Sequence, residues 1–245
     1  MNDFASSVAH FDDDHGLARM SLSGRSLLAH VSGALYWPDE NALIVSDLSL
    51  DLGPAEGLAG SFRAPRDRHR ILGQLSRIVC QFEPKTVISL GTAFRRPTER
   101  ARLAQADIDL LRELQSGRHW FWVPPSPDPI EESDLGGDVV AEVQLGGLRF
   151  QGVPFAGPAI HEIAGGLHPA ARINVRGHDL KRPCFVSNGR RMVLPAFASF
   201  GGGNNVLEHA FRPVFGNDGL FVWMLGQEGI WPVAARQLEP DDLAA

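Results

Sequence analysis

The chain has 245 residues, of which 44% are hydrophobic and 21% charged, a composition typical of a globular protein and not of a disordered or fibrous one. Its 23 basic and 29 acidic residues give a formal net charge of −6, which argues against a protein that coats nucleic acid or anionic membranes, although a local basic groove is compatible with it. The two cysteines lie far apart, which excludes a disulfide scaffold and a four-cysteine zinc site.

The N-terminal residues predict a cytoplasmic protein. Met1 to Phe4 carry no basic side chain, the acidic run Asp12–Asp14 follows, and no stretch approaches the roughly 18 apolar residues that a membrane span needs. We therefore expect no secretory signal and no contact with the membrane. Residues 1–30 are mixed and polar and are expected to form an N-terminal extension, followed by a single domain over residues 31–245.

The first half of the chain alternates predicted strands and helices. Strands are expected at 34–37 and 43–45, around a turn at 38–41. In residues 68–82, apolar side chains recur at helical spacing, and Pro84 follows the helix. A strand at 86–90, a helix around Ile108 to Leu114 and a strand at 119–123 continue the pattern. This alternation predicts a parallel sheet with right-handed crossovers.

The second half is predicted to be mostly β-structure. Short β-like runs cover residues 139–145, 148–151, 171–175, 183–186, 192–194 and 220–225. Asn188-Gly189 between two of them is a strong hairpin signal. Residues 162–169 are expected to form a loop. Both halves are satisfied by an α/β fold in which two sheets pack face to face with helices outside.

Candidate site residues lie where the predicted parallel strands end, because ligands bind at the carboxyl ends of strands in such sheets. These ends are Val45–Ser49, Leu90–Phe94 and Trp122–Pro129, and the loop at residues 162–169 has the same character.

The order of these and neighbouring motifs resembles the calcineurin-like metallophosphoesterases, and more narrowly the ligase-associated DNA damage response endonucleases named PdeM. The markers run from Leu35 to Phe211: Leu35–Pro38, Val45–Leu48, Leu90–Gly91, Trp122 with Asp128–Pro129, Glu162–Gly165, Leu167–Arg172, Arg182–Val186, Leu194–Phe197 and Gly202–Asn204. The resemblance implies a four-layer α/β/β/α sandwich and two divalent metals, often manganese, on loops between the layers. It also implies a setting in DNA repair, with repair proteins as partners.

Against the family's ligand motifs, this chain keeps two residues and loses the others. Asp47 matches the Asp of Asp-x-His, and His168 matches the second His of Gly-His-x-His. The lost ligand positions hold Ser49, Thr92, Ser126, Gly152 and Gly166, and Pro127 replaces the catalytic His. Without the bridging carboxylate, two dications repel each other at close range. Without the His, the expected general acid is missing.

The leading hypothesis is therefore a catalytically degenerate member of the family that holds no metal and serves as a binding or scaffold protein. Arg95 and Arg96 stand at the mouth of the former metal site, and the planar guanidinium group matches the geometry of phosphate. These two residues are the candidates for binding a phosphate-bearing ligand.

The alternative hypothesis is an active phosphoesterase or endonuclease with a remodelled site. In it, Asp47, His168 and either His161 or Glu162 hold one divalent metal, namely manganese, zinc or iron. Nucleic-acid binding stays open, since Trp120 and Trp122 suit either base stacking or core packing.

Overall fold

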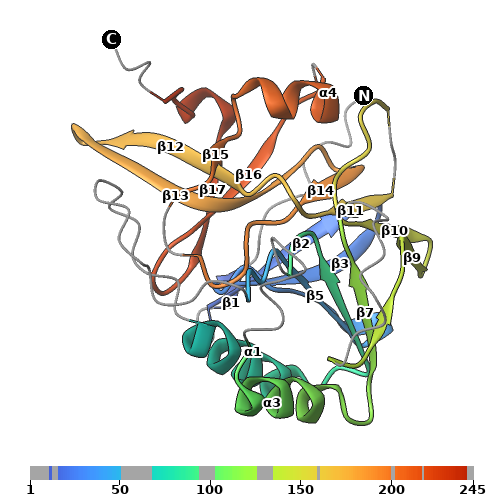
Figure 1. The fold of residues 1–245 in the computed structure, drawn as a ribbon. Coiled ribbons are helices and arrows are strands. Elements are labelled where there is room, and N and C mark those ends of the chain that lie inside the picture. Colours follow the sequence, from blue (N-terminus) through green and yellow to red (C-terminus); the bar gives the residue numbers. More distant parts are fainter. Residues whose placement is uncertain are drawn as a thin grey trace.

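Two sheets pack face to face in the computed structural model, which describes residues 11–12, 16–50, 68–93, 103–125, 135–158, 161–199, 202–216 and 218–241. Helices α1 (Arg68–Phe82) and α3 (Gln105–Gln115) cover the outer face of the first sheet (Figure 1). The outer face of the second sheet carries a thinner layer made of α4 (Arg212–Phe215) and the 3-10 helix η2 (His209–Phe211). The α/β fold of two packed sheets with helices outside, expected from the sequence, is confirmed.

The first sheet has the strand order β1-β2-β3-β4-β5-β6-β7-β8. Neighbours pair antiparallel from β1 to β5 and parallel from β5 to β8. The bounds are β1 Phe11–Asp12, β2 Leu17–Leu22, β3 Arg25–His30, β4 Leu35–Trp37, β5 Ala42–Ser46, β6 Thr86–Leu90, β7 His119–Val123 and β8 Asp138–Val139, with the 3-10 helix η1 (Pro38–Glu40) between β4 and β5. The parallel strands predicted for the first half are confirmed.

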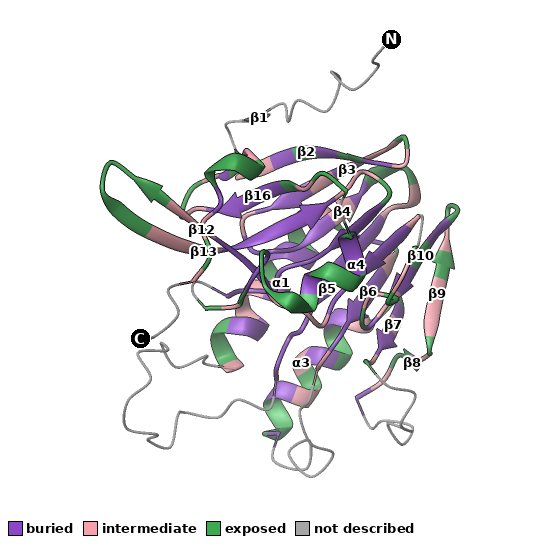
Figure 2. Cartoon of the chain, turned by 90° about the horizontal axis from the view of Figure 1, so that it is seen from above, coloured by how far each residue is buried: buried purple, intermediate pink, exposed green. Residues whose placement is uncertain are grey.

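The second sheet has the order β15-β12-β13-β14-β11-β10-β9, and β16 and β17 extend from β13. Its bounds are β9 Glu142–Leu145, β10 Leu148–Gln151, β11 Glu162–Ala164, β12 Pro169–Val175, β13 His178–Ser187, β14 Arg191–Val193, β15 Asn204–Asn205, β16 Phe221–Leu225 and β17 Ile230–Val233; the 3-10 helix η3 (Ala235–Gln237) follows. The turn at Asn188-Gly189 joins β13 and β14, as predicted. The far end of the β12–β13 hairpin is exposed (Figure 2).

The core explains why β5 is an unbroken apolar run. Leu43 and Val45 face the helices α1 and α3, whereas Ala42 and Ile44 face the second sheet, and all four are fully buried. A strand covered on both faces carries apolar residues at every position and not at alternate ones. The end of this strand is therefore held rigidly where the first candidate site residue follows.

Two expectations are wrong. Residues 17–30 are not part of an extension, because β2 and β3 pair over six residues each and bury Ala18, Met20 and Leu22 between the sheets. Residues 162–169 are not wholly a loop, since the first three form β11 between β10 and β14. Within the described residues, no helix is both long and apolar enough to cross a membrane.

Candidate functional site

Asp47 stands directly after β5, at the edge where the parallel strands end. Its backbone N–H donates to the Leu90 carbonyl at 2.9 Å, and Ser49 N–H donates to the Thr92 carbonyl at 3.1 Å. The pairing of β5 with β6 therefore continues beyond both strands. Gly91 has φ 71°, and a Cβ there would lie 2.3 Å from Asp47 Oδ1. The absent side chain at Gly91 leaves room for the carboxylate.

The Asp47 carboxylate is fully buried and receives a hydrogen-bond donor at every available position. Ser46 Oγ donates to Oδ2 at 2.6 Å and Gly166 N–H at 2.9 Å, while Thr92 N–H donates to Oδ1 at 2.9 Å. His168 Nε2 lies 3.2 Å from Oδ1. A carboxylate has about four lone-pair positions, so none is left for another partner.

The environment of Asp47 keeps its carboxylate charged. Burial by itself raises the pKa of Asp47, but the hydrogen bond and charge of His168, with the donors of Ser46 and Thr92, outweigh it and hold the pKa below its usual value. The His168 side chain is about a third exposed, whereas that of Asp47 is not exposed at all. The imidazole therefore closes the solvent side of a buried anion.

Ser49, Gly152 and Gly166, which the resemblance places at metal-ligand positions, are used for internal packing. Ser49 is buried and donates to the Asp47 carbonyl at 3.3 Å. A Cβ at Gly152 would lie 2.2 Å from the Pro124 carbonyl oxygen, and one at Gly166 would lie 2.6 Å from Val153 Cγ1. Neighbouring atoms thus fill the space that ligand side chains need at both glycines. Arg95, Arg96, Ser126 and Pro127 lie outside the described residues.

The described residues do not form a dinuclear metal centre. Divalent metals of this class take several carboxylate, imidazole or amide ligands each. In the described ranges, no group of three His, Cys, Asp or Glu side chains is placed to hold a metal ion. Asp47 and His168, matched above to metal-ligand motifs in the sequence, contact each other.

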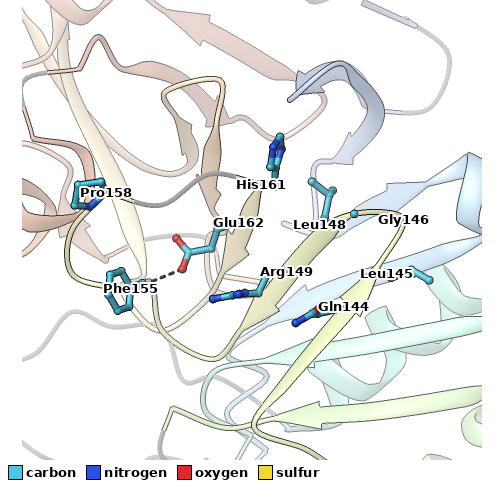
Figure 3. A pocket seen from close by; sticks show the side chains of 10 residues that line it. Gln144, Leu145, Gly146, Leu148, Arg149, Phe155, Pro158, His161 and Glu162 are labelled. Carbon is cyan, nitrogen blue, oxygen red and sulfur yellow. Dashed lines mark hydrogen bonds between the residues drawn. The ribbon is translucent and has the colours of Figure 1, made fainter.

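Of the two residues expected to rebuild a one-metal site, Glu162 is bonded to other groups and His161 is turned away from it. Arg191 Nε donates to Glu162 Oε2 at 2.7 Å, and Phe155 N–H donates to Oε1 at 2.9 Å. His161 points away from this carboxylate (Figure 3), and its buried Nδ1 has no hydrogen-bond partner. Both residues stand at the start of β11, whereas His168 follows its other end. The structure does not bring them together with Asp47.

Sequence reasoning missed two residues that organise this region. Ser46 belongs to a buried strand, and nothing in the run 42–46 indicates that its hydroxyl donates to the next residue. Arg191 stands in a polar turn sequence beside Arg190, yet it is 1% exposed. Only the register of β14 beside β11, which pairs it with Glu162, reveals its role.

No protein-family model and no curated protein sequence matches the chain. Among solved structures, the chain is similar to the nuclease MPE of Pseudomonas putida, with a TM-score of 0.68 and 24% sequence identity. The match covers 89% of this chain and 100% of that one. At this identity the similarity shows a shared fold, in agreement with the two-sheet architecture described above.

Proposed function

We propose that this chain is a catalytically degenerate relative of the PdeM-type metallophosphoesterases. It acts in the cytoplasm as a binding or scaffold protein and takes no metal cofactor. DNA repair is the setting that the resemblance implies, and repair proteins are the expected partners. The similarity to a solved nuclease supports the scaffold; the degeneracy is our inference from the residues.

The observation that carries this proposal is the saturated carboxylate of Asp47. Four donors, from Ser46, Thr92, Gly166 and His168, occupy it. A metal ion that bound this carboxylate would have to take the place of at least one of these donors, or of the proton between His168 and Asp47. Protein groups that are already paired in a buried site give up those bonds at a cost of roughly 1–3 kcal/mol each.

The ligand proposed for this protein is a phosphate-bearing molecule held by Arg95 and Arg96. Guanidinium groups bind phosphate through paired hydrogen bonds without a metal. The experiment is calorimetric titration with inorganic phosphate, comparing the parent protein with the double variant Arg95→Ala/Arg96→Ala. Binding by the parent that the variant loses supports the assignment, and equal behaviour of the two proteins contradicts it.

The degeneracy itself is tested by metal content and thermal melting. We expect the purified protein to retain no stoichiometric metal, and added manganese, zinc or ferrous iron to leave the melting temperature unchanged, because a ligand that binds only the native state raises stability. A metal-dependent rise, absent in Asp47→Asn, would overturn the proposal. Manganese-dependent cleavage of a phosphodiester that disappears in the same variant would establish the one-metal hydrolase instead.

A further inference from the structure

A cavity of about 530 Å³ lies on the outer face of the second sheet, away from Asp47. Its floor is the polar side of β9, β10 and β11, and the loop after β10 forms one wall (Figure 3). The residues that matter here are Gln144, Arg149, Phe155, Pro158 and Glu162. The volume falls within the range of roughly 300–1,000 Å³ that is usual for small-ligand sites.

The wall loop is held in place by a buried ion pair. Glu162 and Arg191 are both almost fully buried and face each other across β11 and β14. Glu162 accepts a hydrogen bond from Phe155 N–H, and Arg191 donates to the Phe155 and Gly157 carbonyls at 2.8 and 2.9 Å. A pair of buried charges thus fixes the backbone on both sides of Phe155.

The side chain that this loop presents is exposed. Phe155 is 56% exposed, although its backbone is fully bonded. Because the backbone at Phe155 is already ordered, only the ring itself loses conformational freedom when a flat ligand stacks on it. Pro158 lies in the same wall and adds a second apolar surface.

A cationic group faces the same space. Arg149 is the register partner of Glu162 on β10, and its side chain is 52% exposed. The Glu162 charge is balanced by Arg191, and the ion-pair partner of Arg149 is Glu142, with 3.6 Å between Nε and Oε2. Figure 3 shows Arg149 and Glu162 extending toward the side of the cavity where Phe155 lies.

Other polar groups border the site. Gln144 Nε2 donates to Glu142, so its amide oxygen is available as an acceptor. Arg25 does not line the cavity, but its Nε donates to the carbonyl of the lining residue Gly146 at 2.8 Å. A stacking ring, a half-exposed guanidinium and an amide are the groups that proteins use for the ring, phosphate and edge of a nucleotide.

We propose that this cavity binds a nucleotide unit, either free or within a single strand of nucleic acid. The base stacks on Phe155, and its phosphate pairs with Arg149. The cavity shares no lining residue with the Asp47–His168 pair, so the proposal stands even if the chain proves to bind metal.

The experiment measures binding of AMP and of a fluorescent hexathymidylate to the full chain at low salt. We compare Phe155→Leu and Arg149→Gln with matched surface controls, Phe221→Leu and Arg236→Gln. Phe221 is also an exposed phenylalanine, and Arg236 an exposed arginine. We expect each cavity variant to weaken binding about tenfold, the effect of losing one stacking or phosphate contact, and the controls to match the parent.

The two probes separate the two sources of the ligand. Binding of AMP identifies a free nucleotide, whereas binding of the hexathymidylate alone identifies a single strand. The proposal is overturned if neither probe binds. It is also overturned if binding is lost in Arg95→Ala/Arg96→Ala and unchanged in Phe155→Leu and Arg149→Gln.

Discussion

His168 Nε2 lies 3.2 Å from Asp47 Oδ1 and joins the end of β5 in the first sheet to the segment between β11 and β12 in the second. Gly166 N–H, from the same segment, donates to the other oxygen of the carboxylate. One buried anion thus connects the two sheets. The contact therefore fixes the position of the two sheets relative to each other at this end of the strands.

The first prediction concerns the charge of Asp47. In Asp47→Asn the amide nitrogen would face donors from Ser46, Gly166, Thr92 or His168, so at least one buried donor loses its acceptor. We expect a loss of about 2–4 kcal/mol in the free energy of unfolding, measured by urea denaturation. Asp109→Asn, at an exposed position on α3, is the control and should change stability little. Equal effects of the two substitutions would contradict the role of the pair.

The second prediction concerns Gly91. In Gly91→Ala the new Cβ would strike the Asp47 carboxylate at 2.3 Å, in addition to the strain of a positive φ. Gly24→Ala carries the same backbone strain, with φ 79° and nothing within 4 Å. We expect Gly24→Ala to cost about 1 kcal/mol and Gly91→Ala at least twice that in a thermal melt. Similar melting temperatures for both variants would show that the Asp47 carboxylate can move aside at little cost in stability.

The third prediction is that a ligand side chain cannot be restored at Gly152. In Gly152→His the Cβ would meet the Pro124 carbonyl, so the strand or the loop has to move. We expect a lower melting temperature than in the parent, and we expect that added manganese does not raise it. Gly73→His, in α1 with open space around it, is the matched control and should melt at or above the parent temperature, because glycine is a poor helix former.

The fourth prediction concerns the ion pair beneath the cavity wall. Glu162→Gln leaves the buried Arg191 guanidinium without its anion, for which we expect a loss of about 3–5 kcal/mol. Glu142→Gln removes the carboxylate from an exposed pair and should cost less than about 1 kcal/mol. Chemical denaturation of both variants decides the point, and a small effect at Glu162 would mean that the pair does not hold the loop.

The fifth prediction concerns pH. Burial lowers the pKa of His30 from 6.5 to about 4, so the folded state disfavours its protonated form. The stability due to neutral His30 is fully present above pH 6.5 and is lost as the pH falls from 6.5 to about 4, by up to about 3 kcal/mol. The pKa of Asp47 is also lowered, but its contribution to stability is lost only as the pH falls below about 3.8, the pKa of the unfolded state. We expect the free energy of unfolding to fall less between pH 7 and pH 4.5 in His30→Gln than in the parent, as measured by urea denaturation. An equal fall in both proteins would show that His30 is not the cause.

The sequence predicted those elements whose pattern is local. Residues 68–82 repeat apolar side chains at the helical period, and the helix α1 has the same bounds. The strands β2 and β3 were missed because apolar and polar residues alternate in them, which gives the segment a mixed, polar composition although one face is covered by the second sheet. The strand β11 was missed because three residues are too few for any period.

The sequence was enough to select the residues of the candidate site, but it did not reveal which of them contact each other. Asp47 and His168 were both singled out, but their contact joins two sheets, and no local pattern records it. Glu162 was expected near a metal because its chemistry allows it, whereas strand register places it beside Arg191. Phe155 stands alone between a proline and an alanine, so nothing in the sequence distinguishes its exposed ring from a core side chain.

The close packing around Gly152 and Gly166 also bears on how the chain can evolve. Any substitution at either glycine adds a Cβ that meets neighbouring atoms, so a single codon change there lowers stability before a new function can offset the loss. Compensating substitutions would have to come first, in the strands and loops that supply those atoms. These two positions are therefore expected to change more slowly than the exposed surface does.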